Sequence, residues 1–297
     1  GAEALIGKAA LARGRARQTS VPRYEVFDDA IRGVVEHRRR TELALRRGIE
    51  REEFVLYYQP VIRIEDAKVC GFEALVRWDH PDQGVVPPGE FVPIAEDSHL
   101  IVTIGEWVMT EACRQLATWH RDPDKQALSV SINLSARQLA EPRLVEVVKD
   151  VLASTGAPPD SVTFELTETM LLADIDLALR TLSELKETGV RIALDDFGTG
   201  YSSLSYLVQF PIDVLKVDQS FVGQLGGPGR DTSVVASVVS LAATLGLDVV
   251  AEGVETLDQV EHLRSLGCTF AQGFLYSRPK AVADLGELIE AGQVVVG

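Results

Sequence analysis

Short apolar runs rich in β-branched residues alternate with longer amphipathic stretches along most of the chain after residue 50. Runs of the first kind predict buried strands, and the longer stretches have the apolar spacing of helices. The predicted strands are Phe54–Ile62, Val69–Trp78, Leu128–Ser135, Val162–Glu168, Arg191–Gly198, Val214–Val222, Asp248–Glu255 and Phe270–Ser277. The predicted helices are Ile104–His120, Pro142–Thr155, Asp174–Thr188, Asp231–Leu245, Leu257–Leu266 and a last one after Ala281. Three of them are followed by a glycine that can end a helix: Gly189, Gly246 and Gly267.

This alternation is typical of a parallel sheet, either open and doubly wound or closed into a barrel. The span from Phe54 to Ala291 is close to the roughly 250 residues of a (β/α)₈ barrel, so the closed form is favoured. Only about six residues separate the first two strands, too few for a helical crossover, and that pair should be antiparallel. We therefore expect an α/β fold, an irregular (β/α)₈ TIM-type barrel with an antiparallel first strand.

The composition supports a large core and argues against one class of partner. Of 297 residues, 46% are hydrophobic and 25% charged. The 44 acidic residues outnumber the 29 basic ones and give a formal net charge of −15, so we expect no binding to nucleic-acid polymers. A small anion can still bind where local basic groups or metal ions reverse the field. Residues 1–50 carry a basic excess, which indicates a boundary near residue 50.

The three cysteines have neither an even count nor a CxxC spacing. Neither a disulfide framework nor a thiolate zinc site is indicated, and the cytoplasm is the expected location. The longest uncharged stretch, residues 232–247, is shorter than the about 20 residues that span a bilayer. We expect no signal peptide and no membrane contact by this chain, although a longer protein that contains it can be membrane-anchored.

Polar residues stand at or just after the ends of nearly every predicted strand. They are Glu73, Asn133, Glu165, Glu168, Asp195, Asp196, Lys216, Asp218, Glu252 and Gln272. Taken singly, such a residue usually caps a helix or lies in solvent. Taken together, they follow apolar strands whose carboxyl ends meet at one mouth of a barrel. Carboxylates crowded there repel one another and need a cation.

The candidate ligands are hard oxygen donors. The histidines have no HxxxH or HExxH spacing, which argues against zinc, whereas Mg²⁺ or Mn²⁺ suits carboxylate and amide oxygens. Because one Mg²⁺ keeps several waters, this many acids indicates two ions about 4 Å apart, bridged by Asp195 or Asp196. Such sites perform in-line displacement at phosphorus.

Two basic residues accompany the acids, and each allows two interpretations. Lys216 shares a strand face with Asp218, and it either forms a plain salt bridge or orients the attacking water. Arg77 shares a face with Glu73, and it either grips a phosphate or pairs with Asp79 at the surface.

Several motifs occur in a fixed order: YYQP at 57–60, EALVRW at 73–78, SINLS at 131–135, FELTE at 164–168, DDFGTGYSSL at 195–204, LKVDQSFV at 215–222, AEGVET at 251–256 and QGF at 272–274. With them the chain resembles the EAL-type cyclic di-GMP phosphodiesterases, from about Arg38 to the C-terminus. The resemblance implies two Mg²⁺ or Mn²⁺ ions per site. One would be held by Glu73, Asn133, Glu165 and Asp195, and the other by Asp195, Asp196 and Glu252.

The resemblance also implies roles around these ions. Lys216 would assist the attacking water, and Gln272 would support that network. The groups that would contact the substrate are Glu73 and Leu75 of the motif Glu73-Ala74-Leu75, Arg77 at a phosphate, and Gln59 and Asp218 at the guanine side.

Assembly and domain organisation follow from the same resemblance. Glu168 would anchor the loop Asp196–Leu204, which with a neighbouring helix couples the metal site to a homodimer interface in such proteins. Residues 1–37 resemble the tail of a preceding GGDEF domain and its connecting segment, and residues 38–297 the EAL barrel. We expect a charged connecting helix over Arg32–Glu52 and further GGDEF or sensory domains before it in a longer signalling protein.

The function implied is metal-dependent hydrolysis of cyclic di-GMP to linear pGpG in bacterial second-messenger signalling. A domain that binds cyclic di-GMP without cutting it remains the alternative. A third possibility is a different barrel enzyme that uses Mg²⁺ and a lysine for enolisation.

Overall fold

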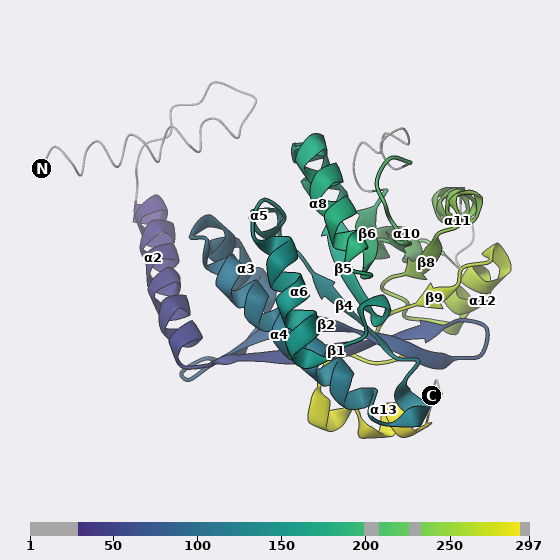
Figure 1. Ribbon diagram of the computed structural model, residues 1–297, viewed down its shortest axis with the longest axis horizontal. Coiled ribbons are helices and arrows are strands. Elements are labelled where there is room, and N and C mark those ends of the chain that lie inside the picture. The colour runs from purple at the N-terminus through teal and green to yellow at the C-terminus, as the bar shows by residue number, and fades with distance from the viewer. Residues whose placement is uncertain (1–28, 199–207, 226–232, 292–297) are drawn as a thin grey trace, which may run out of the picture.

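Eight strands close into a barrel in the computed structural model, which describes residues 29–198, 208–225 and 233–291 (Figure 1). Around the barrel the strands follow the order β1 (Phe54–Arg63), β9 (Phe270–Ala271), β8 (Asp248–Ala251), β7 (Val214–Val217), β6 (Arg191–Phe197), β5 (Val162–Thr167), β4 (Ser129–Asn133) and β2 (Lys68–His80). Strand β1 pairs with both β9 and β2, and this double pairing closes the ring. The expected closed α/β barrel is confirmed.

The first strand runs against the others, as predicted. Strand β1 is antiparallel to β2 and to β9, whereas the neighbours from β2 through β9 by way of β4 are all parallel. A short turn joins β1 to β2, and the two long strands form the hairpin that crosses the lower half of Figure 1. Because the other six strands and β2 run the same way, their carboxyl ends lie at one rim.

Helices cover the outside of the barrel. The longer ones are α2 (Asp29–Glu50), α3 (Pro88–Asp97), α4 (Leu100–Trp119), α6 (Leu144–Thr155), α8 (Ile175–Glu187), α11 (Ser233–Leu245) and α12 (Leu257–Leu266) (Figure 1). Three short helices follow strands at the carboxyl rim: α5 (Ala136–Leu139) after β4, α7 (Glu168–Ala173) after β5 and α10 (Gln219–Val222) after β7. Further short pieces are β3 (Gly84–Val86), β10 (Lys280–Ala281) and α13 (Gly286–Ala291), with 3₁₀ turns at Pro123–Lys125, Pro159–Ser161 and Val282–Asp284.

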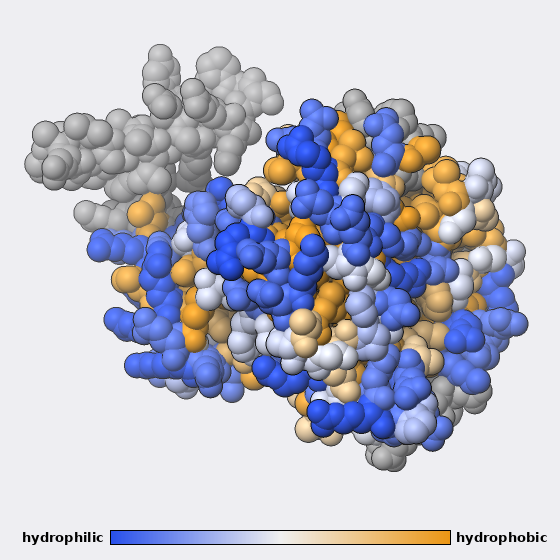
Figure 2. Space-filling view, in the orientation of Figure 1, coloured by the Kyte–Doolittle hydropathy of each residue, from blue (hydrophilic) through white to orange (hydrophobic). Residues whose placement is uncertain are grey.

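The main core lies between the barrel and its helices. Outward-facing strand residues such as Phe72, Ile132 and Leu215 are essentially buried against the helix layer. A second, much smaller apolar cluster lies inside the barrel and consists of Ala193, Val214 and Val250, with Val61 and Phe270 packed against it. Figure 2 shows one face of the surface, on which hydrophilic and hydrophobic residues are interspersed.

Several predicted elements need correction. The strand expected over Val214–Val222 ends at Val217, because Asp218 caps helix α10 with its side chain. The strand expected over Phe270–Ser277 ends at Ala271, and that over Asp248–Glu255 at Ala251. Strand β3 and helix α3 were not predicted at all.

The N-terminal helix was predicted. Helix α2 covers Asp29–Glu50, close to the expected Arg32–Glu52, and Leu45 on it is fully buried. The expected domain boundary between residues 37 and 38 falls inside this helix. Of the segment 1–37 that resembles a GGDEF tail, residues 1–28 lie outside the described residues. None of the helices in the described part of the chain is both long and apolar enough to cross a membrane.

Candidate functional site

The carboxyl rim brings together acids from strands that are far apart in the sequence. Lys216 on β7 lies at their centre, with its side chain only 2% exposed. Its Nζ is 2.7 Å from Oε2 of Glu165 and 2.6 Å from Oε1 of Glu252. The same Nζ is 3.6 Å from Oε2 of Glu73 and 3.6 Å from Oδ1 of Asp195. Lys216 is thus the shared counter-ion of four carboxylates rather than half of a plain salt bridge.

The electrostatics of this cluster follow from burial and from the single ammonium. Burial alone would lower the pKa of Lys216, but the charges of its carboxylate neighbours, Glu165 first, raise it well above its usual value. Burial raises the pKa of Glu165 well above its ordinary value, against the attraction of Lys216. Burial likewise raises the pKa of Glu252 to about 7. The ammonium therefore stays charged, and part of the acid set holds protons near neutral pH.

Glu73 is held by two amides as well as by Lys216. Its Oε1 accepts a hydrogen bond from Nδ2 of Asn133 at 2.7 Å, and its Oε2 accepts one from Nε2 of Gln272 at 2.6 Å. The same Nε2 donates to Oε1 of Gln59 at 3.0 Å, and Nε2 of Gln59 donates to the carbonyl oxygen of Ser277 at 3.1 Å. Burial would raise the pKa of Glu73, but Lys216 and these donors outweigh it and the pKa is lowered.

A β-bulge turns two successive carboxylates toward one place. Neighbouring side chains of a regular strand point to opposite faces, which would separate Asp195 from Asp196. Here the register slips by one residue between Leu194 and Phe197, and Asp196 adopts a left-handed φ of +54°. The backbone N–H of Asp196 donates to Oδ1 of Asp195 at 2.8 Å.

The bulge creates the acidic group best suited to a cation. One carboxylate oxygen from each of Asp195, Asp196 and Glu252 lies within 4.8 Å of the others, the only such group of three or more acidic, histidine or cysteine ligands found among the described residues. Burial, and then the charges of Asp195 and Asp218, raise the pKa of Asp196. Oxygen ligands at this spacing suit Mg²⁺ or Mn²⁺. Of the other expected ligands, Glu73 and Glu165 lie near the Nζ of Lys216, and Asn133 donates its hydrogen bond to Glu73.

An open pocket of about 240 Å³ adjoins the acids on the rim side. Expected substrate contacts Gln59 and Leu75 line it, together with Glu73, Glu252 and Gln272. Sequence reasoning did not name several other lining residues, among them Gln219, Glu255 and Phe274. The ring of Phe274 is 49% exposed and the guanidinium of Arg278 lies 4.2 Å from its centroid. The sequence signal that could have identified Phe274 is its position directly after Gln272-Gly273, in the last predicted barrel strand.

Three expected site residues have other neighbours. Arg77 is not among the residues that line this pocket; its Nη1 donates to the carbonyl of Val76 at 2.9 Å and its guanidinium lies 5.5 Å from the Tyr57 ring. Oδ1 of Asp218 accepts a hydrogen bond from the backbone N–H of Ser220 at 3.0 Å and so caps α10.

Glu168 is the third of these residues. It is buried, at 8% exposure, in the first turn of α7. Most of the loop that it was expected to anchor, Asp196–Leu204, and with it the expected dimer contact, lies outside the described residues.

A mixed eight-stranded barrel with a basic residue and clustered acids at its carboxyl rim belongs to the class of barrels that carry their active or binding sites there. The EAL domain matches residues 42–279, and the chain belongs to the EAL domain family. The bifunctional diguanylate cyclase/cyclic di-GMP phosphodiesterase MucR of Pseudomonas aeruginosa is 44% identical over 81% of this chain and 35% of its own length. An uncharacterized signaling protein of Caulobacter vibrioides is 43% identical over 98% of this chain and 35% of its own length.

Solved structures agree with this assignment. The MucR phosphodiesterase in complex with c-di-GMP superposes with a TM-score of 0.79 at 43% identity, covering 83% of this chain and 99% of that one. The EAL enzyme Bd1971 in its cAMP- and cyclic-di-GMP-bound form has a TM-score of 0.80 at 31% identity, covering 88% of this chain and 70% of that one. The chain spans about a third of the length of the curated relatives it matches first.

Proposed function

We propose that this chain hydrolyses cyclic di-GMP to linear pGpG. The observation that carries the proposal is the gathering of Asp195, Asp196 and Glu252 within 4.8 Å, beside Lys216 and with Glu252 at the wall of an open pocket. Membership of the EAL domain family and similarity to the phosphodiesterase MucR supply the substrate class.

Two Mg²⁺ or Mn²⁺ ions fit the donor set. Asp195, Asp196 and Glu252 would hold one ion, and Glu73, Asn133, Glu165 and Asp195 would hold the other, with Asp195 common to both sets. All these ligands offer oxygen atoms, and the first three are already within a cation's reach of one another. When bound, two such ions would polarise the phosphate oxygens and acidify the attacking water.

The reaction adds one water across one phosphodiester bond. The water oxygen forms a bond to phosphorus, the bond from phosphorus to the ribose 3′-oxygen breaks, and one proton ends on that 3′-oxygen. Glu252, as a ligand of one ion, would help to hold the attacking water in line with the bond that breaks. Lys216, 2.6 Å from Oε1 of Glu252, orients that carboxylate and the water beside it.

The remaining residues bind and position the substrate in this proposal. Gln59 and Leu75 line the open pocket and contact the dinucleotide, and Gln272 holds Glu73 in place. Arg77 and Asp218 reach the phosphate and guanine groups from the edge of the site. Glu168 supports the loop after Asp196.

The proposal extends to the assembly in the cell. The partners are a second copy of this chain, through the loop after Asp196 and its neighbouring helix, and GGDEF or sensory domains in a longer protein. The place of action is the bacterial cytoplasm.

Product analysis tests the activity. Incubation with cyclic di-GMP and Mg²⁺ or Mn²⁺ in ¹⁸O-labelled water should yield pGpG with one ¹⁸O in its terminal phosphate. Glu73→Ala should abolish the product, whereas Glu184→Ala, which removes an exposed carboxylate on α8 outside the site, should leave it unchanged. Ca²⁺, with its looser coordination, should allow binding without turnover.

The same experiment separates the enzyme from a sensor. Tight binding with intact dinucleotide after long incubation in Mg²⁺ and in Mn²⁺ would establish a sensor and refute the hydrolase. No affinity for any cyclic dinucleotide would refute both and favour a different barrel chemistry.

A further inference from the structure

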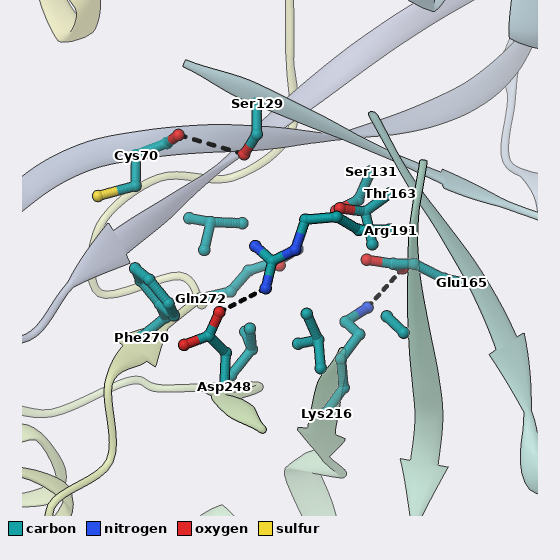
Figure 3. Close-up of a pocket in the computed structure, with 14 residues that line it drawn as sticks. Cys70, Ser129, Ser131, Thr163, Glu165, Arg191, Lys216, Asp248, Phe270 and Gln272 are labelled. Atoms are coloured by element: carbon teal, nitrogen blue, oxygen red, sulfur yellow. Dashed lines mark hydrogen bonds and ion pairs between the residues drawn. The ribbon is translucent and has the colours of Figure 1, made fainter. Parts of the chain in front are cut away.

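A second cavity lies inside the barrel, beneath the acid cluster and away from the open pocket (Figure 3). Its volume is about 60 Å³. The barrel interior of this fold is normally filled by bulky branched side chains. Here several inward positions carry small residues, Ser129, Ser131, Thr163 and Ala193, and these leave the space. We call this cavity the lower chamber.

The roof of the lower chamber is made of site residues. Glu165, Lys216 and Gln272 line it from above, and Gln272 also lines the open pocket on the other side. Gln272 is 4% exposed and lies among the side chains that reach into the chamber in Figure 3. It therefore forms part of the partition between the substrate side and the chamber.

One buried atom of that partition lacks a partner within the described part of the chain. Oε1 of Gln272 accepts no hydrogen bond there, although it is screened from bulk solvent. Rotating the amide does not solve this, because Oε1 would then face Oε2 of Glu73, which now accepts from Nε2 at 2.6 Å. A buried acceptor without a hydrogen bond lowers the stability of the folded state by about 1–3 kcal/mol. A hydrogen-bond donor at Oε1 of Gln272 would remove this loss.

Water is the donor that the lower chamber can hold. A water needs roughly 10–15 Å³ of such space and two to four polar partners, so the chamber has room for about four waters. Hydroxyls of Ser131 and Thr163 offer further partners beneath Gln272. Apolar residues of the inner cluster, such as Val214 and Val250, also line the chamber, so its polar groups are the ones that can hold water.

The floor of the lower chamber is an ion pair. Nη2 of Arg191 lies 2.5 Å from Oδ2 of Asp248, and Figure 3 shows the arginine extending across the cavity to reach the acid. The two side chains are 35% and 37% exposed, so solvent reaches this end. The pair therefore narrows the opening of the chamber at the amino ends of the strands without sealing it.

We propose that the lower chamber holds an ordered water cluster that donates to Oε1 of Gln272 and so keeps this positioning residue against Glu73. The ion pair of Arg191 and Asp248 retains the cluster. An effect of the cluster on metal binding rests on the proposed function, because it requires Glu73 to be a metal ligand. The presence of the water cluster does not rest on the proposed function.

Crystallography tests the cluster directly. A metal-free structure at a resolution that reveals ordered water should show a molecule within hydrogen-bond distance of Oε1 of Gln272. Thr163→Val keeps the side-chain volume and removes one hydroxyl, and it should displace water from the chamber. An empty wild-type chamber, or a protein donor on Oε1, would overturn the proposal.

Calorimetry tests the consequence. Thr163→Val should weaken Mn²⁺ binding by roughly three- to tenfold, at or below the lower end of the effect of residues that support metal ligands. Thr244→Val, the same change on the outer helix α11, is the matched control and should bind Mn²⁺ like the wild type. Unchanged affinity in Thr163→Val with the water lost would refute the positioning role.

The outcomes of the two proposals stay distinct. Ordered water at Gln272 in a chain that does not hydrolyse cyclic di-GMP would refute the proposed hydrolase and support the water cluster. Hydrolysis by a chain whose chamber holds no water would support the hydrolase and refute the water cluster.

Discussion

Replacing Lys216 by methionine removes the cation that four carboxylates share. Methionine keeps most of the side-chain length, so the change is mainly one of charge. Glu165 and Glu73, at 3% and 7% exposure, are then left buried without their counter-ion. Breaking a buried ion pair by removing one partner costs about 3–5 kcal/mol. We expect metal-free Lys216→Met to lose about that much free energy of unfolding at pH 8.

The loss should shrink as the pH falls. Burial raises the pKa of Glu165, and without the ammonium nothing lowers it. A carboxyl whose pKa is higher in the folded state than its unfolded value of about 4.3 binds protons on folding, so its contribution to stability is present at low pH and is lost as the pH rises through the folded-state pKa. The variant should therefore approach the wild type at pH 5.5 and fall furthest behind at pH 8.

Divalent cations should offset the same loss. Any ligand that binds only the folded state stabilises it, by about 2.7 kcal/mol at a hundred times its dissociation constant. Urea unfolding followed by tryptophan fluorescence, in EDTA and then in Mn²⁺, measures both effects. The control is Lys186→Met, whose partner Asp213 lies 2.8 Å away in a pair that is 31% and 26% exposed.

The Lys186→Met control sets the loss of stability with which Lys216→Met is compared. This half-buried pair is partly screened by solvent and so is worth less than a fully buried one. It lies away from the rim, so Lys186→Met should respond neither to Mn²⁺ nor strongly to pH. If Lys216→Met is no more destabilised than Lys186→Met in EDTA at pH 8, the acids are not balanced by this ammonium.

Three further predictions concern single positions. Because the pKa of Glu252 is about 7, protons compete with metal for its carboxylate below that pH. The Mn²⁺ affinity measured by calorimetry should be constant above pH 7 and weaken about tenfold per pH unit below it. A constant affinity from pH 5.5 to 8 would contradict this. At the left-handed Asp196, urea unfolding should find Asn tolerated and Val destabilising by about 1–2 kcal/mol, and equal stabilities would count against a strained bulge. A Cβ on Gly273 would lie 2.1 Å from the carbonyl oxygen of Val254, so Gly273→Ala should cost at least about 2 kcal/mol in the same assay, whereas Gly286→Ala meets no atom within 4 Å and should cost nothing.

The sequence predicted the barrel because short, largely apolar strands alternate with amphipathic helices, several of which end at glycines. It missed α3 for a chemical reason: Pro88 and Pro93 are read as breaks, although the first occupies the first turn, where its missing N–H costs nothing. Strand β7 was predicted too long because apolar residues continue past its end into α10. Asp218, whose side chain accepts a hydrogen bond from the backbone N–H of Ser220, was not recognised as the residue that caps this helix.

The site was predicted as a set of residues but not as an arrangement. Strand ends converge by topology, so placing Glu73, Glu165 and Lys216 at one rim needed only the strand order. The bulge that turns Asp196 toward Asp195 has no sequence signature beyond the adjacent acids, since it depends on the register against β7. The lower chamber also went unpredicted, because its space comes from small residues on different strands that become neighbours only when the barrel closes.

The charges at the rim can be balanced in more than one way. Fully ionised, the acids Glu73, Glu165, Asp195, Asp196 and Glu252 carry five negative charges, and Lys216 supplies one positive charge. Two divalent cations would supply the other four, whereas one would leave a double negative charge facing a dianionic dinucleotide in a chain of net charge −15. Without cations, the raised pKa values of Glu165, Asp196 and Glu252 allow protons to take part of that place. Protons and metal ions therefore compete for the same oxygens, so conditions that strip metal from the rim should be those under which its acids protonate.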